Sequence, residues 1–211
     1  MTEIPGKRPW YAHPQLNSMR VAKLIFYLIR DQIERGKIVF DPMVGTGTLL
    51  IPWARAGWPV LGYDINLDCI EWAEMRFEKL GLRGVFKFAD STRDMWPQDP
   101  ALIVFSPPST NIRPAFPSAC RETGLSWAQL RKLQEQFRMS REEIRNTMRI
   151  IYSRVFGYED VPVVVVLQHK PFAPRPKKTP DCTFYTKYSK ILFYNITPQL
   201  WHMEVDDIVE P

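Results

Sequence analysis

The sequence predicts an α/β fold built on a mostly parallel sheet with helices on both faces. Short apolar runs alternate with amphipathic stretches along the 211-residue chain, which is the pattern of strands joined by crossover helices. Several of these runs end in an acid or a serine, and ligands of parallel sheets bind where the strands end. The run 161–168, VPVVVVLQ, is apolar enough to lie at the centre of such a sheet.

Length and composition fit one domain spanning residues 1–211. Hydrophobic residues make up 45% of the chain, no apolar run reaches the ~18 residues of a membrane span, and the N-terminus lacks a signal-peptide core. Three scattered cysteines indicate neither a disulfide framework nor a zinc site. We therefore expect a cytoplasmic monomer without a metal. The net charge of +5 favours an anionic partner such as nucleic acid.

The N-terminal elements are an arm and a helix. Prolines and glycines make residues 1–17 an extended arm. A helix is expected from 19 to about 35, because apolar residues recur there at helical spacing and Gly36 can end it.

Strands and helices then alternate. Residues 38–40 form an apolar strand, and Gly45 and Gly47 allow a tight turn before a helix at 48–55. The next elements are expected to be a strand at 60–65, a helix at 67–80, a strand at 84–90 and a strand at 101–105.

Two insertions, 111–157 and 168–190, are expected to bind the substrate. Capping boxes at Ser126 with Gln129 and at Ser140 with Glu143 predict two helices in the first insertion, which is rich in basic residues. The second interleaves basic residues with prolines and aromatics, which suits an extended chain that contacts phosphates and unstacked bases. A solvated helix face and a plain surface loop are the alternatives. Two closing strands are expected at 191–196 and 200–208.

Four strand ends carry polar side chains, those of Asp41, Asp64, Asp90 and Ser106. Asp64 follows the glycine loop at the distance from which a carboxylate can accept both hydrogen bonds of a ribose diol. Asp90 can accept from the amine of an adenine, while the backbone N–H of Ser91 reads a ring nitrogen. No Walker lysine follows the glycines and the spacing is not GxGxxG, which disfavours phosphoryl transfer and dinucleotide chemistry.

The loop 41–48, DPMVGTGT, resembles the cofactor loop of S-adenosylmethionine-dependent amino-methyltransferases, whose usual form is DPFxGSGT. Residues 106–108, Ser-Pro-Pro, are similar to their catalytic tetrapeptide, and 13–16, HPQL, resemble the arm that precedes the loop in the N4-cytosine group. The resemblance covers about 8–110 and the strand at 161–168. It implies a Rossmann-like class I methyltransferase fold, with a mostly parallel seven-stranded sheet and a C-terminal antiparallel strand pair.

The resemblance also assigns roles to residues. It implies that S-adenosylmethionine is bound by His13, Asp41, Pro42, Gly45, Thr46, Gly47, Thr48, Asp64, Ile65, Asp90 and Ser91. Catalysis falls to Ser106, Pro107 and Pro108. The Ser106 hydroxyl and the Pro107 carbonyl can hold the N–H bonds of an exocyclic amine out of plane, which restores its nucleophilic lone pair, while the two prolines fix the backbone. The sulfonium supplies the electrophile, so no metal is required.

One position departs from the family pattern. An aromatic residue usually follows the two prolines and stacks on the flipped base, but this chain has Ser109. Tyr11, Phe116 and Phe172 are the candidates for this platform, and the small residue leaves room for an amine that already bears one methyl group, which would allow dimethylation. Basic residues are expected to complete the substrate contacts: Lys170, Arg175, Lys177 and Lys178.

The favoured function is therefore methylation of the N4 amine of cytidine in RNA, because serine at the first motif position is typical of N4-cytosine enzymes. RNA is favoured over DNA because a structured RNA can present an unpaired cytidine by shape, and the compact chain points to ribosomal RNA. Three alternatives stay open: a DNA N4-cytosine methyltransferase, a non-catalytic RNA-binding protein on a methyltransferase scaffold, and a small-molecule amine methyltransferase.

Overall fold

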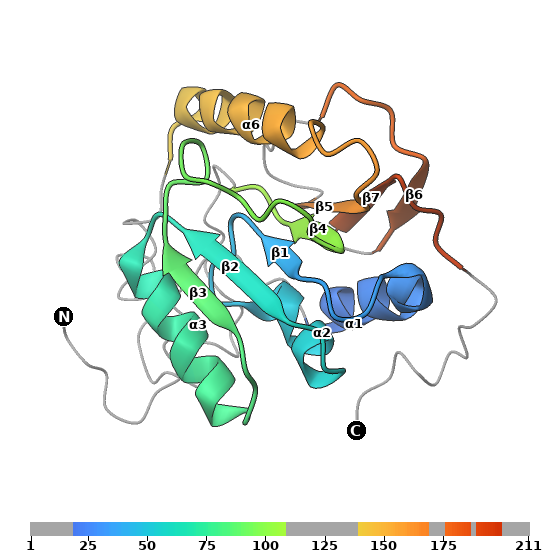
Figure 1. Ribbon diagram of the computed structural model, residues 1–211. Helices are drawn as coiled ribbons and strands as arrows, with labels where there is room; N and C mark the ends of the chain where they lie inside the picture. The colour runs from blue at the N-terminus through green and yellow to red at the C-terminus, as the bar shows by residue number, and fades with distance from the viewer. Residues whose placement is uncertain (1–18, 109–138, 169–175, 187–188, 200–211) are drawn as a thin grey trace.

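A computed structural model of the chain describes residues 19–108, 139–168, 176–186 and 189–199 (Figure 1). These residues form a seven-stranded sheet with the order β3-β2-β1-β4-β5-β7-β6. Five strands are parallel: β1 (Val39–Asp41), β2 (Val60–Asp64), β3 (Val85–Phe88), β4 (Leu102–Phe105) and β5 (Val163–Gln168). β7 (Ser189–Tyr194) is antiparallel to β5 and to β6 (Cys182–Tyr185). The expected mostly parallel sheet with a C-terminal antiparallel pair is confirmed.

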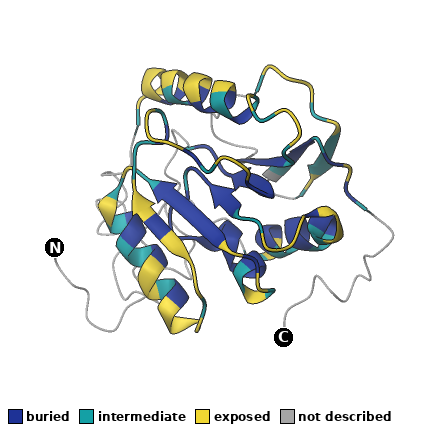
Figure 2. Ribbon diagram, in the orientation of Figure 1, coloured by how far each residue is buried: buried dark blue, intermediate teal, exposed yellow. Residues whose placement is uncertain are grey.

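Helices cover both faces of the sheet, as Figure 1 shows. One face carries α1 (Met19–Ile29), α2 (Ile51–Arg55) and α3 (Leu67–Lys79), and the other carries α6 (Arg141–Val155). Each face packs its own hydrophobic cluster, so the central strands are buried on both sides (Figure 2). No helix within the described ranges is long and apolar enough to cross a membrane.

The first two predicted helices are shorter than expected. α1 ends at Ile29 and continues as the 3₁₀ turn η2 (Arg30–Gln32), although its buried face is the predicted one. The helix expected at 48–55 begins as the 3₁₀ turn η3 (Thr48–Leu50) and becomes α-helical only in α2. Pro52 explains this, because it has no N–H to donate to the carbonyl four residues earlier.

The capping box predicted at Ser140 is confirmed. Its Oγ accepts from the backbone N–H of Glu143 at 3.1 Å, and Oε2 of Glu143 accepts from the backbone N–H of Ser140 at 2.6 Å. The apolar residues at helical spacing after this cap are fully buried: Ile144, Met148, Ile151 and Val155. The helix predicted after Ser126 lies outside the described residues.

Strand β6 differs from the sequence prediction. Residues 182–185 were expected in an extended loop, and they form an edge strand instead. The strand predicted at 191–196 corresponds to β7, while 200–208 lie outside the described residues. The run Thr-Phe-Tyr favours a strand, and β7 is its hydrogen-bonding partner. The run is too short and too polar to stand out as an apolar strand in the sequence.

Candidate functional site

The loop after β1 bends sharply at two glycines. Gly45 and Gly47 have φ values of 51° and 77°, in the left-handed region that suits glycine. A Cβ on Gly47 would lie 2.9 Å from Cε2 of Phe77 on α3. Both the backbone conformation and the close approach of α3 therefore require glycine at 47.

Asp64, at the end of β2, bonds to this loop. Its Oδ2 accepts from the N–H of Gly45 at 2.9 Å, and its Oδ1 accepts from the N–H of Asn66 at 2.9 Å. Each carboxylate oxygen accepts more than one hydrogen bond, so both keep capacity for a ligand. Burial raises the pKa of Asp64, although the N–H groups of Asn66 and Gly45 oppose the rise. Ile65 beside it is 69% exposed, so a large apolar side chain stands next to a half-buried acid.

Asp41 is buried beneath the same loop. It is 1% exposed, and its Oδ1 accepts from the N–H of Met43 at 2.9 Å. Burial raises the pKa of Asp41 well above its ordinary value, and the neighbouring charge of Asp64 adds to this. The geometry makes Asp41 an internal brace of the loop, in contrast to the more accessible Asp64.

Arg76 on α3 supports the loop from behind and was not singled out from the sequence. Its Nη1 donates to the Thr48 hydroxyl at 2.6 Å and to the Thr46 carbonyl at 3.2 Å. Both threonines are buried. In the sequence Arg76 is one of several charged residues on an amphipathic helix, and no local signal distinguishes it from a solvated side chain.

The loop after β3 holds itself and the loop after β1. The buried Ser91 donates its hydroxyl to the Pro42 carbonyl at 2.5 Å. Oδ1 of Asp90 accepts from the Thr92 amide at 2.9 Å and the Thr92 hydroxyl at 2.6 Å. Burial would raise the pKa of Asp90, but these bonds, with Arg93 and Arg154 nearby, outweigh burial and lower it. Part of the acceptor capacity of Asp90 is thus used within its own turn.

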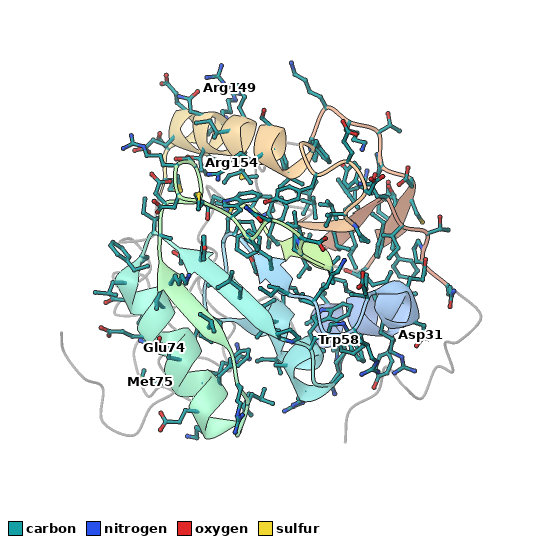
Figure 3. The ribbon with its side chains drawn as sticks, viewed as in Figure 1. Asp31, Trp58, Glu74, Met75, Arg149 and Arg154 are labelled. Carbon is teal, nitrogen blue, oxygen red and sulfur yellow. The ribbon has the colours of Figure 1, made fainter. Side chains whose placement is uncertain are left out.

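Arg154, near the end of α6, clamps this second loop and was assigned from the sequence only to a basic stretch. Its Nη1 donates to the Ser91 carbonyl at 2.7 Å and its Nη2 donates to the Asp94 carbonyl. Its guanidinium carbon lies 4.6 Å from the ring centroid of Trp96, whose Nε1 donates to the same Ser91 carbonyl at 3.1 Å. Figure 3 shows Arg154 on the side of α6 that faces the sheet. The helix α6 is therefore joined to the loop that carries Asp90 and Ser91.

Ser106 follows β4 directly and is 3% exposed. Its hydroxyl donates to the Val166 carbonyl on β5 at 3.0 Å. A hydroxyl has one hydrogen and two lone pairs, so the oxygen is left to act as an acceptor. Because β4 pairs with β1, Ser106 and the glycine loop lie at the ends of neighbouring strands. Pro107 is buried and Pro108 is half-buried.

The remaining predicted residues divide into two groups. Several lie outside the described residues: Tyr11, His13, Ser109, Phe116, Lys170, Phe172 and Arg175. Lys177 and Lys178 are exposed. Lys178 donates to Oδ1 of Asn195, which in turn donates to the Val161 carbonyl just before β5. The structure thus places Lys178 at the amino end of β5, away from the edge that holds Ser106. Within the described ranges, no group of His, Cys, Asp and Glu could hold a metal ion.

Comparison with known proteins identifies the architecture. No family model matches the chain. A possible methylase from Clostridium difficile 630 superposes with a TM-score of 0.63 at 15% identity, over 89% of this chain and 55% of that one. The chain has a Rossmann-like methyltransferase fold. Magnesium protoporphyrin IX methyltransferase from Synechocystis PCC 6803, solved with bound SAM, also matches, with a TM-score of 0.51 at 16% identity over 83% of this chain and 77% of that one.

A curated relative shares sequence with part of this methyltransferase fold. The tRNA (guanine(10)-N2)-dimethyltransferase of Pyrococcus abyssi is 33% identical over 88 residues. These make up 41% of this chain and 25% of the relative, so the match spans about a quarter of that protein.

Proposed function

We propose that this chain is an S-adenosylmethionine-dependent methyltransferase that modifies an exocyclic amine of a base in RNA, with N4 of cytidine as the favoured target. The observation that carries the proposal is the Ser106 hydroxyl, whose hydrogen is donated to Val166 at the end of the strand beside the glycine loop. The fold is shared with a methyltransferase solved with bound SAM, and the name of the curated relative specifies an RNA substrate.

The residues at the end of β2 fit S-adenosylmethionine. Asp64 keeps acceptor capacity on both oxygens, which suits the two hydroxyls of a ribose. The exposed side chain of Ile65 offers an apolar surface for the adenine. When bound, S-adenosylmethionine supplies an electrophilic methyl group on its sulfonium. The chain itself binds and orients this donor through the loop that Asp64 and Arg76 hold in place.

Ser106 and Pro107 would hold the amine that receives the methyl group. The amine of a base is a weak nucleophile because its lone pair is delocalised into the ring. Because the Ser106 hydroxyl donates its hydrogen to the Val166 carbonyl, its oxygen can act only as an acceptor toward the amine. The Pro107 carbonyl is a second acceptor. Holding both N–H bonds with fixed acceptors orients the lone pair toward the donor, so catalysis comes from positioning and electrostatics.

Two bases compete as the target. Serine before the two prolines favours cytidine N4, by resemblance to the N4-cytosine group. The curated relative supports a second candidate, N2 of guanine, because its name gives that atom in tRNA and two methyl groups. The small side chain of Ser109 is compatible with dimethylation of either amine.

The test is transfer of isotope-labelled methyl groups from S-adenosylmethionine to ribosomal RNA, tRNA and DNA, followed by mass spectrometry of the nucleosides. We expect N4-methylcytidine or its dimethyl form from ribosomal RNA, and product formation roughly 100-fold slower with Ser106→Ala. Labelled N2-methylguanosine would show that the target is N2 of guanine, the second candidate, and not N4 of cytidine. Label found only in deoxycytidine would reassign the enzyme to DNA. No label, together with no calorimetric binding of S-adenosylmethionine, would reject the enzyme in favour of a non-catalytic scaffold.

A further inference from the structure

The helix α6 carries a row of exposed arginines on one side. Arg141, Arg145 and Arg149 are each four residues apart and exposed. Residues at this spacing are neighbours on a helix surface, about 6 Å apart along the axis. In Figure 3, Arg149 lies on the outer side of the helix. We name these three residues the arginine ridge.

Two arginines of the ridge lie where the helix macrodipole does not favour positive charge. Positive charge near a helix N-terminus opposes the macrodipole, and like charges four residues apart repel. Arg141 and Arg145 nevertheless lie in the first half of α6. The acids Glu142 and Glu143 stand in the favourable first turn, and Glu143 also completes the capping box. The macrodipole and the capping box therefore account for the two acids, but not for the positive charge of Arg141 and Arg145 at this end of the helix.

The ridge extends beyond the edge of the sheet that carries the proposed site. Tyr152 of α6 packs against Phe105, with ring centroids 6.2 Å apart, and Phe105 is the residue before Ser106. The chain leaves the carboxyl end of β4 before α6 and enters the amino end of β5 after it, so α6 runs against these strands. Residues before Tyr152 therefore lie progressively farther beyond the edge of the sheet at which Ser106 lies. Arg141 is about 16 Å from Tyr152 along the helix axis. In Figure 1 the N-terminal end of α6 lies toward the side to which β2 and β3 point.

We propose that the arginine ridge binds the phosphate backbone of the RNA and holds the substrate beside Ser106. This inference rests on the proposed function, and it names the surface and the chemical group that the surface recognises. The planar guanidinium of arginine donates several hydrogen bonds and suits phosphate oxygens. A row of such groups follows a strand of phosphates without reading its sequence, so base selection is left to the Ser-Pro-Pro corner.

The inner side of α6 gives this surface a link to the cofactor side. Arg154 bonds to the carbonyls of Ser91 and Asp94, and Ser91 bonds to Pro42. The outer side of α6 thus carries the arginine ridge, and its inner side contacts the loops of the proposed cofactor site. RNA held by the ridge is fixed relative to both halves of the proposed site.

The ridge is tested by replacing its three arginines together with glutamine, in Arg141→Gln/Arg145→Gln/Arg149→Gln. A matched control is Arg55→Gln/Lys79→Gln/Arg83→Gln, which removes the same charge from three exposed residues at the ends of α2 and α3 and before β3. Binding is measured by fluorescence anisotropy of a fluorescein-labelled RNA hairpin with an unpaired cytidine in its loop, over a series of salt concentrations. Methyl transfer to RNA and binding of S-adenosylmethionine are measured separately.

We expect the ridge variant to bind the hairpin about tenfold more weakly. The slope of log K against the logarithm of the salt concentration should become shallower by roughly 2, because each of three lost phosphate contacts contributes about 0.7. We expect its KM for RNA to rise by a similar factor, while kcat and the affinity for S-adenosylmethionine stay within about twofold. Equal weakening in the control variant, unchanged binding in the ridge variant, or no salt-dependent binding by the native protein would each overturn the proposal. Because hairpin binding does not require turnover, failure of the ridge is separate from failure of the methyltransferase assignment.

Discussion

Two loops at the same edge of the sheet are built in different ways. The glycine loop after β1 is held by side chains from several parts of the chain: Asp64 after β2, Arg76 on α3 and Ser91 after β3. The Ser-Pro-Pro corner after β4 is joined to β5 by the Ser106 hydroxyl and stiffened by the rings of its two prolines. The first loop is held by side chains from three other elements, whereas the second is held by one hydrogen bond to β5 and by the rings of its own prolines.

The difference between the two loops predicts which property a substitution in each of them should change. A loop held by many partners keeps its shape when one bond is lost, so single changes there should alter affinity or stability in moderate steps. The Ser-Pro-Pro corner has only one side-chain acceptor, the Ser106 oxygen, and the Pro107 carbonyl cannot take its place, so loss of the hydroxyl should act on the chemical step.

The largest expected effect is that of Ser106→Ala. Without the Ser106 acceptor, kcat should fall roughly 100-fold, which corresponds to about 2.7 kcal/mol, while binding of S-adenosylmethionine stays unchanged. Asp64→Ala should give the reverse pattern, with cofactor affinity weakened by roughly 1–3 kcal/mol. Calorimetry and single-turnover kinetics separate the two, and an equal loss of cofactor affinity in both variants would remove the contrast between the loops.

The next effect compares two glycines that both have positive φ. Gly47→Ala places a Cβ 2.9 Å from Phe77 at a φ of 77°, whereas Gly57→Ala, at a φ of 88°, meets no atom within 4 Å. Backbone strain alone costs about 1–2 kcal/mol, and crowding against Phe77 adds to it only at position 47. Thermal denaturation should therefore show a clearly larger loss for Gly47→Ala, together with weaker cofactor binding. Equal losses would mean that α3 does not restrain the loop.

A smaller effect is expected for Arg154→Gln, which removes the clamp on the loop after β3. Loss of the two charged bonds to the carbonyls of Ser91 and Asp94 should cost about 1–2 kcal/mol of stability and raise the KM for S-adenosylmethionine more than it lowers kcat. Arg154→Lys should restore part of the effect, while the exposed Arg55→Gln serves as the control. An effect on kcat alone would contradict a role in holding the cofactor loop.

The smallest effect concerns pH and tests the buried brace of the glycine loop. Because burial raises the pKa of Asp41, the native state binds its proton more tightly than the unfolded chain. This contribution to the free energy of unfolding is complete below the unfolded pKa and is lost as pH rises through the folded pKa. Asp41→Asn keeps a neutral side chain, so the fall in melting temperature as the pH rises above the ordinary pKa of an aspartate, about 3.9, should shrink. Asp64, whose pKa is also raised, should leave a residual dependence, and an unchanged slope in Asp41→Asn would show that Asp41 is ionised in the native protein.

Local patterns in the sequence predicted much of this molecule. The mostly parallel sheet follows from the alternation of elements, its C-terminal antiparallel pair from the family resemblance, and the capping box of Ser140 and Glu143 from residues only three positions apart. Arg154 could not be assigned in this way, because its partners Ser91 and Asp94 lie 63 and 60 residues away. Arg76 is a similar case, since its partners Thr46 and Thr48 lie 30 and 28 residues away. Such contacts exist only after the sheet and its helices have packed.

The bond from Ser106 to Val166 also limits how the proposed reaction can dispose of a proton. The Ser106 hydroxyl keeps its hydrogen, which it donates to the Val166 carbonyl. If its oxygen took a proton from the amine, it would become a protonated, positively charged hydroxyl, so Ser106 is not a general base. The amine gains positive charge as it gains its methyl group and becomes strongly acidic, and its hydrogen can then pass directly to water. A rate–pH profile governed by the nucleobase, with no ionisation belonging to the serine, is the expected consequence.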